Sequence, residues 1–325
     1  MWVWSRPTSA TGPWSGPWEG GMRFNPKARL DTARTSDAGR SSGGSGGIPI
    51  PGGLAGGGIG GLIVTAIIVV AFMYLGGGSP PSAAYDAGRM SDTERYADCK
   101  TGEDANTSAD CARVAVENSL YDYWGDTLPA QSDATFSPEK QLRTFGGGVS
   151  TGCGSASAAV GPFYCPADET IYLDTTFFED VLDQQLGGPT GAFVEPYVLA
   201  HEYGHHIQHL LGTDDRVRSR EGARSDAVRL ELQADCYAGM WAGSATDTED
   251  ANGAVLISDL TRTDVEQAIA AATAVGDDRI QEASGGDVDP DSWTHGSAKQ
   301  RVEWFTRGFE QGTLTACDTF AAGAL

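Results

Sequence analysis

Four of the five histidines in the chain lie between positions 201 and 209, with a spacing that suits metal binding. In His201-Glu-Tyr-Gly-His205 two histidines stand four residues apart. On a helix they would lie on one face, one turn apart, and could share a zinc ion. Glu202 would lie about 100° around the helix from His201, where it can face a zinc-bound water. These features predict a zinc hydrolase in which Glu202 is the general base.

A catalytic zinc commonly has three protein ligands and one open position, so another element must supply a third ligand. A predicted helix over 225–241 carries Glu231 and Asp235, four residues apart and on one face. We expect Glu231 to bind the metal and Asp235 to accept a hydrogen bond from the free ring nitrogen of His201 or His205. The reverse assignment, with Asp235 as the ligand, stays open.

An oxyanion that forms during hydrolysis needs a further hydrogen-bond donor. The first candidate is His295, the one histidine outside the cluster, although a surface or core histidine is an equally good interpretation. Tyr203 and Tyr237 are weaker alternatives. His206 points away from the ligand face and is expected to be structural. His209 lies about 12 Å along the helix axis from His201, too far to bind the same zinc.

Gly204 is costly inside a helix, by about 1 kcal/mol relative to alanine. Its presence within the motif predicts that another backbone comes close to the helix at this point. We expect that backbone to belong to a strand beside the site.

The order of expected elements indicates an α+β domain over 91–315, followed by a tail over 316–325. Strands are expected between 145 and 174, and Thr170–Asp174 alternates like a half-buried strand. Three helices are expected over 108–124 with Ser108 as N-cap, over 175–186, and over 225–241 with Ser225 as N-cap. The helix that carries the histidine motif should have Pro196 in its first turn. Two further helices are expected to begin with capping boxes, Thr263/Glu266 and Ser297/Gln300.

An apolar run over 62–75 lies in a charge-free window and predicts one membrane helix over 62–76. Basic residues precede it, so the N-terminus should face the cytoplasm and the domain should lie outside. A buried core helix or a cleaved signal peptide are the alternatives. Residues 1–61 are expected to be flexible, with 1–21 as a gene-start artefact before Met22, and 77–90 is expected to be a linker.

Cysteine usage agrees with an exported domain, because all six cysteines follow the apolar run. Sequence alone does not fix the pairing of six cysteines. We favour Cys99–Cys111, Cys153–Cys165 and Cys236–Cys317, because the first two pairs close short local loops. Reduced, buried cysteines are the alternative.

The formal net charge is −22, and residues 1–75 carry a basic excess, so the domain itself is strongly acidic. An acidic surface repels phosphate backbones, and we therefore expect no nucleic-acid partner. The composition says nothing about the substrate.

Four separated segments together resemble the bacterial neutral zinc metallopeptidase family. They are His201-Glu-Tyr-Gly-His-His-Ile-Gln208, Gly161-Pro-Phe-Tyr-Cys-Pro-Ala-Asp168, Glu231-Leu-Gln-Ala-Asp-Cys-Tyr-Ala-Gly239 and His295-Gly-Ser-Ala-Lys-Gln-Arg-Val302. The start at Met22 is also similar to that family's N-terminus. The resemblance covers about residues 22–312 and implies a membrane-anchored protein with a zincin-like domain in which a glutamate is the third ligand, the gluzincin type.

The sequence thus predicts a zinc-dependent peptidase on a single-pass anchor in the cell membrane, acting on a peptide or protein substrate. Two alternatives stay open. The chain could be a non-catalytic envelope protein with a structural zinc, which would need four protein ligands. It could also be a zinc hydrolase of non-peptide amides.

Overall fold

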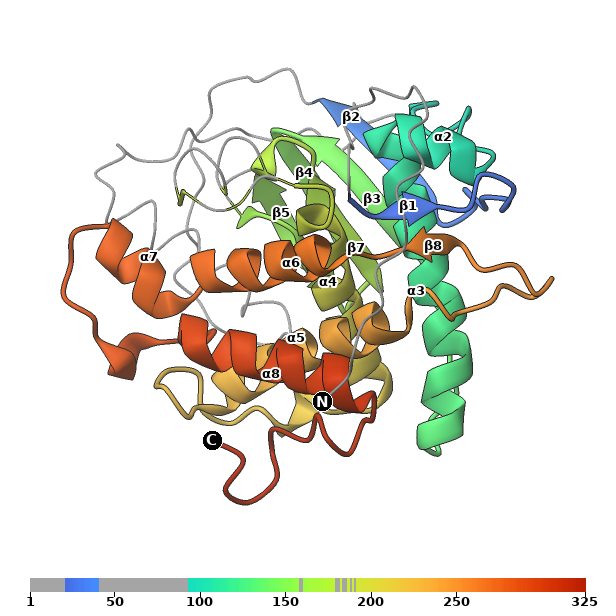
Figure 1. Ribbon diagram of the computed structural model, residues 1–325. Helices are drawn as coiled ribbons and strands as arrows, with labels where there is room; N and C mark the ends of the chain where they lie inside the picture. Colours follow the sequence, from blue (N-terminus) through green and yellow to red (C-terminus); the bar gives the residue numbers. More distant parts are fainter. Residues whose placement is uncertain are drawn as a thin grey trace.

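The computed structural model describes residues 21–40, 93–157, 160–178, 182, 186–187, 189 and 191–325. The strands gather on one side of the molecule, and on the other side helix α8 packs against both α5 and α6 (Figure 1). The α+β class expected from the sequence is confirmed.

A four-stranded sheet in the order β2-β3-β7-β6 forms the centre of the strand layer. Strands β2 (Thr35–Arg40), β3 (Gln141–Gly146) and β7 (Thr170–Asp174) are parallel, and β6 (Phe163–Cys165) runs antiparallel to β7 at the edge. All five residues of β7 are buried, so the half-buried strand expected there is in fact covered on both faces. Two small pairs complete the strands: β4 (Gly148–Thr151) with β5 (Gly154–Ser157), and β1 (Arg23–Phe24) with β8 (Ile257–Asp259).

The helices begin largely at the capping residues that the sequence indicates. The hydroxyls of Ser108 and Ser225 accept the N–H groups of Cys111 and Val228, and Ser297 forms its capping box with Gln300. The helices are α2 (Gly102–Thr107), α3 (Ala109–Gln131), α4 (Val194–Leu210), α5 (Asp226–Ser244), α6 (Arg262–Ala274), α7 (Asp277–Ala283) and α8 (Ala298–Gln311).

One expected cap was wrong by two residues. Helix α6 is opened by a box between Thr261 and Asp264, because Asp264 is the side chain that reaches back to the backbone N–H of Thr261. Glu266 instead pairs with Arg262 on the exposed surface. Half of the expected helix over 175–186 lies outside the described residues.

Residues 22–40 belong to the domain, and the expectation that they are flexible was wrong. Met22 and Phe24 are buried in the main core, and β2 adds to the central sheet. Arg34 forms an ion pair with the buried Glu117 of α3, Nε to Oε1 at 2.7 Å. Apolar side chains and ion pairs therefore fix a segment whose sequence looks like a polar linker.

The pairing of β2 with β3 constrains any membrane topology. Paired strands must lie on one side of a membrane, whereas a single crossing over 62–76 would place them on opposite sides. The apolar run itself lies outside the described residues. Among the residues that are described, no helix is long and apolar enough to span a bilayer.

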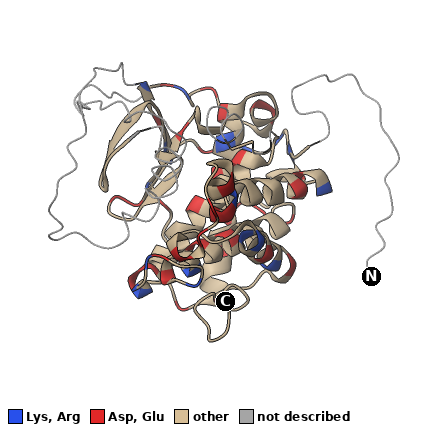
Figure 2. Ribbon diagram, turned by 90° about the vertical axis from the view of Figure 1, so that its left-hand side faces the viewer, with Lys and Arg blue, Asp and Glu red and all other residues tan. Residues whose placement is uncertain are grey.

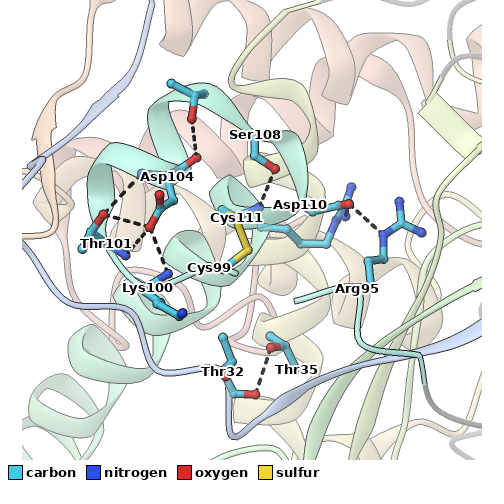
Figure 3. Close-up of a disulfide and its surroundings, with 12 residues drawn as sticks. Thr32, Thr35, Arg95, Cys99, Lys100, Thr101, Asp104, Ser108, Asp110 and Cys111 are labelled. Carbon is cyan, nitrogen blue, oxygen red and sulfur yellow. Dashed lines mark hydrogen bonds and ion pairs between the residues drawn. A yellow bond between two sulfur atoms is a disulfide. The ribbon is translucent and has the colours of Figure 1, made fainter. Parts of the chain in front are cut away.

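All three expected disulfides are present, and the described cysteines leave no free thiol. Cys99–Cys111 joins the segment before α2 to the first turn of α3, next to the Thr101 capping box and the Arg95–Asp110 ion pair (Figure 3). Cys236–Cys317 ties the C-terminal segment to the middle of α5 across 81 residues. The residues after 315 are thus a part of the domain and not a separate tail.

Acidic residues are spread over most helices (Figure 2), in line with the charge of the domain. The apolar core lies between the sheet and the helices, with Trp124, Trp241 and Phe305 almost fully buried. Helices α5 and α8 approach most closely at glycines: a Cβ on Gly308 would lie 1.8 Å from the carbonyl oxygen of Cys236.

We expect Gly308→Ala to lower the free energy of unfolding by about 1–3 kcal/mol, because the new methyl group would push α8 away from α5. Gly125→Ala in α3 is the matched control, since the nearest atom to its Cβ lies 3.7 Å away. That control should be neutral or stabilising by up to about 1 kcal/mol. Chemical denaturation measures both, and equal stability of Gly308→Ala and wild type would contradict the packing described.

We also expect single cysteines placed at Lys27 and at Lys299, both exposed, to react with an impermeant thiol reagent from the same side of the membrane in intact cells. The pairing of β2 with β3 requires this result. Labelling from opposite sides would show instead that residues 22–40 leave the domain in the cell. Wild type, whose cysteines are all in disulfides, gives the background.

Candidate metal centre

Helix α4 carries the two histidines of the motif on its buried side. Pro196 lies in its first turn, and the helix stops before Gly212, which has φ of 66°. The rings of His201 and His205 lie 4.8 Å apart between centroids, and both are largely buried. The helix thus delivers two imidazoles to one point, as the spacing predicts.

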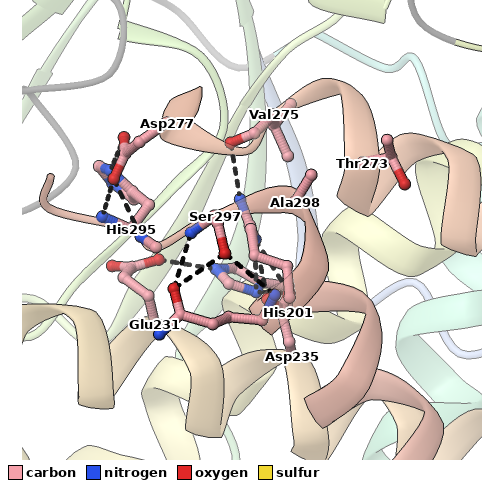
Figure 4. A network of polar contacts seen from close by, with 12 residues as sticks. His201, Glu231, Asp235, Thr273, Val275, Asp277, His295, Ser297 and Ala298 are labelled. Carbon is pink, nitrogen blue, oxygen red and sulfur yellow. Dashed lines mark hydrogen bonds and ion pairs between the residues drawn. The ribbon is translucent and has the colours of Figure 1, made fainter. Parts of the chain in front are cut away.

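Glu231 on α5 faces both imidazoles. Its Oε2 lies 3.2 Å from His201 Nε2 and its Oε1 lies 3.6 Å from His205 Nε2. One ligand atom from each of the three residues lies within 4.8 Å of the other two. Figure 4 shows His201 and Glu231 turned toward each other, with Asp235 beside them. The structure therefore brings together the three ligands that the sequence predicts.

Gly204 lets α4 and α5 come this close. A Cβ on Gly204 would lie 3.1 Å from both Cα and the carbonyl oxygen of Ala234. The close backbone that we expected is therefore present, but it belongs to α5 and not to a strand. Ala234 lies between Glu231 and Asp235 on its own helix, so the contact sets the distance between the two halves of the site.

Two buried polar atoms in this group, His205 Nε2 and Glu231 Oε1, have no hydrogen-bond partner among the described residues. A cation between them would satisfy both. Burial lowers the pKa of a histidine, yet the Asp235 carboxylate raises the pKa of His201 to about 10, and Glu231 raises that of His205. Raised pKa values mean that the site attracts positive charge, so the donor set and the field both fit Zn²⁺.

Asp235 holds His201 as expected, because its Oδ1 accepts the ring Nδ1–H at 2.9 Å. The reverse assignment, with Asp235 as ligand, is not supported, since both of its oxygens are already bonded. Arg301 donates to Oδ2 at 2.8 Å and to Oδ1 at 2.9 Å, and the Tyr197 hydroxyl donates to Oδ1 at 2.6 Å. Burial alone would raise the pKa of Asp235, but Arg301 holds it below its usual range.

Arg301 and Tyr197 were not among the residues expected at the site. Both are almost fully buried and line the cavity. Arg301 does fall within one of the segments that carry the family resemblance, and a buried arginine nearly always needs an acidic partner. Its place in that segment and this need for an acidic partner are the features of the sequence that could have indicated Arg301.

Glu202 lies where a general base would be needed. It projects from α4 into the same cavity, and its Oε2 accepts the backbone N–H of Tyr164 on edge strand β6 at 2.9 Å. Burial raises the pKa of its carboxyl, although the two neighbouring histidines oppose that shift. A raised pKa suits a group that must take up a proton.

His295 lines the cavity from the turn before α8, and it is buried. Its Nδ1 bonds the Thr294 hydroxyl at 2.7 Å and lies 3.5 Å from Asp277 Oδ1, while its Nε2 has no hydrogen-bond partner in the part of the chain that the structure describes. Asp277 Oδ2 also accepts the N–H groups of Thr294, His295 and Gly296, which fixes this turn. Figure 4 shows His295 and Asp277 above Glu231.

The two tyrosines considered as alternative donors lie elsewhere. The Tyr203 ring packs against His206, and Tyr237 packs against Trp124; neither lines the cavity. His206 is structural, as expected, because it bonds the Tyr164 hydroxyl and the Ser137 carbonyl. His209 is partly exposed and pairs with Asp214 at 2.8 Å.

The cavity over the metal group measures about 780 Å³, including the part open to solvent. Its polar lining consists mainly of the residues described above. Apolar side chains form the rest of the wall, and among them are Val160, Pro162, Phe177, Leu182, Leu186, Val198, Ala271 and Val275.

A family model described as "Putative neutral zinc metallopeptidase" matches residues 22–320. The uncharacterized protein YpfJ of Escherichia coli K12 is 36% identical over 308 residues, which cover 92% of this chain and 99% of that protein. An uncharacterized protein of Mycobacterium tuberculosis is 49% identical over 229 residues, 70% of this chain and 76% of its own length. No solved structure matches the chain.

We expect Asp235→Asn to weaken zinc binding by about 10–100-fold, because His201 loses the carboxylate that fixes its ring. It should also cost about 3–5 kcal/mol of stability, since Arg301 would remain buried without a counter-ion. Asp226→Asn, in the half-buried first turn of the same helix, is the control. Chelator competition and denaturant unfolding measure the two effects, and wild-type zinc affinity in Asp235→Asn would contradict this role.

Proposed function

Because the chain belongs to the neutral zinc metallopeptidase family, we propose that it hydrolyses peptide bonds with Glu202 as general base. The observation that carries the proposal is the convergence of His201, His205 and Glu231 on one point in a cavity that Glu202 also faces. A three-ligand site with a nearby carboxylate is the arrangement of catalytic zinc.

When bound, Zn²⁺ lowers the pKa of a coordinated water toward about 7 and polarises the substrate carbonyl. Glu202 takes the proton from the attacking water and then gives it to the leaving amine. The Tyr164 N–H holds one oxygen of Glu202, which leaves the other free for that proton transfer. Burial, by raising the Glu202 pKa, favours the protonated form that the second step needs.

His295 is the donor that we assign to the developing oxyanion. Its Nε2 has no other partner, and Asp277 and Thr294 hold the ring from the opposite side. A donor fixed before the reaction stabilises the new charge at little cost in reorganisation.

An extended peptide suits the shape of the site. Strand β6 is the edge of the central sheet, and Gly161 and Pro162, directly before it, line the cavity. An edge strand offers backbone groups to a peptide laid alongside. The apolar wall formed by Val198, Ala271 and Val275 suits a bulky apolar side chain next to the bond that is cut.

A purely structural zinc is disfavoured. Such a site has four protein ligands, whereas the metal group within the described residues contains three. His295 also lines the cavity, but it is not one of the three residues whose ligand atoms lie within 4.8 Å of one another.

We further propose that the domain works outside the cytoplasm and is attached to the cell membrane. Three disulfides support an oxidising compartment. The attachment is inferred from the apolar run over 62–75. Because β2 pairs with β3, the segments before and after that run would have to lie on the same side of the membrane.

We expect Glu202→Gln to lower kcat by at least about 10²–10⁴-fold while zinc content stays at the wild-type level, because the base is lost and the ligands are kept. His201→Ala/His205→Ala should lose the zinc. Metal analysis and cleavage of unfolded proteins and peptide libraries measure these outcomes. Full activity of Glu202→Gln, or hydrolysis of non-peptide amides alone, would refute the proposal.

A further inference from the structure

The free ring nitrogens of the two metal-binding histidines are held in different ways. Asp235, a carboxylate paired with Arg301, holds His201. His205 has no charged partner on that side, because its Nδ1 bonds Gln208 Oε1 at 2.8 Å. What holds Gln208 therefore decides how firmly His205 is held.

Gln208 is the first member of a buried relay that ends at the C-terminal segment. Its Nε2 donates to the Leu230 carbonyl at 2.7 Å and to Gln233 Oε1 at 3.1 Å. The Nε2 of Gln233 in turn donates to the backbone carbonyl of Cys317 at 3.0 Å. Both glutamines are almost fully buried, so water does not compete for these bonds.

The two ends of the relay fix its direction. Backbone carbonyls can only accept hydrogen bonds, so each glutamine must turn its NH₂ group toward the carbonyl of Leu230 or Cys317. The Oε1 of Gln208 must then face His205, and its partner Nδ1 must carry the proton. With Nδ1 protonated, the lone pair of His205 lies on Nε2, the atom that faces Glu231.

Residue 317 is held in place from several directions. A buried disulfide joins Cys317 to Cys236 in the middle of α5. Thr319 donates its hydroxyl to the Arg229 carbonyl at 2.7 Å, and Arg229 donates to the Thr319 carbonyl in return. The carbonyl that ends the relay is therefore fixed against the helix that carries Glu231.

We infer that the segment 313–320 is a positioning element of the metal site, which acts on His205 through Gln233 and Gln208. The inference rests on zinc as the metal of the proposed function, but not on the substrate or on peptide hydrolysis. It gives the Cys236–Cys317 disulfide a role in metal binding in addition to its role in stability.

The test is zinc affinity by chelator competition in Gln233→Met, which keeps the side-chain length and removes both polar groups. We expect the dissociation constant to rise about tenfold, the low end for a lost outer-shell partner, because the Leu230 carbonyl still holds Gln208. The matched control is Gln131→Met. Gln131 also bonds the C-terminal segment, at Gly312 and Leu314, but it does not reach His205.

The melting temperatures of the zinc-free proteins separate positioning from stability. The relay requires Gln233→Met to lose more zinc affinity than Gln131→Met at comparable zinc-free stability. In ¹⁵N-histidine spectra of the zinc-loaded protein, the Nδ1–H signal of His205 should shift or broaden in Gln233→Met and stay unchanged in Gln131→Met. Equal zinc affinity and unchanged spectra in both variants would overturn the inference.

A second pair of variants covers the case in which Gln233→Met does not fold. Cys236→Ala/Cys317→Ala should weaken zinc binding, whereas Cys153→Ala/Cys165→Ala, which opens the disulfide of the β4–β5 region, should not. If Gln233→Met folds, its effect and that of the Cys236/Cys317 pair should be less than additive. Wild type that binds zinc but cuts no peptide would refute the proposed function and leave this test intact.

Discussion

The contact between α4 and α5 at Gly204 and Ala234 is the constraint on which the site depends. Two helices usually pack with axes 8–10 Å apart, and a glycine at the crossing allows the near end of that range. Here it brings the imidazoles of one helix to the carboxylate of the other without any intervening loop. A Cβ at position 204 would lie 3.1 Å from the backbone of Ala234, so a side chain there would press α4 and α5, and with them the ligands, apart.

Helices at this distance bury charges that must be compensated. Glu231 and Asp235 are almost completely enclosed, and an enclosed carboxylate is unstable unless it is paired. Asp235 has Arg301 from α8, and Glu231 faces the two histidines and the place of the metal. The glycine contacts of α8 with α5 therefore matter for chemistry as well as packing, because they bring Arg301 to Asp235.

Sequence predicts the parts of this site that depend on local spacing. A spacing of four residues along one helix predicts the pair His201 and His205, and the same spacing along another helix predicts the pair Glu231 and Asp235. The two short disulfides follow from the closeness of their cysteines in the sequence. Arg301 and Tyr197 contact the same carboxylate from two other helices, and no pattern within one helix predicts a contact between distant segments.

The strand within residues 22–40 was missed for the same reason. Strand β2 has little apolar content, and only its pairing with the distant strand β3 makes it a strand. The cap of α6 was misplaced because two threonines, Thr261 and Thr263, both precede an acidic residue by three positions.

The relay from His205 to Cys317 also has a consequence for the order of synthesis, disulfide formation and metal binding. Residue 317 is synthesised after His205, Gln208 and Gln233, and its partner Cys236 lies 81 residues earlier. Because the inferred relay ends at the carbonyl of Cys317, the metal site would gain its full affinity only after residue 317 has been added and the Cys236–Cys317 disulfide has formed. A chain in which this disulfide has not yet formed would then hold the ion less tightly than the oxidised domain, so oxidation of two cysteines would precede tight zinc binding.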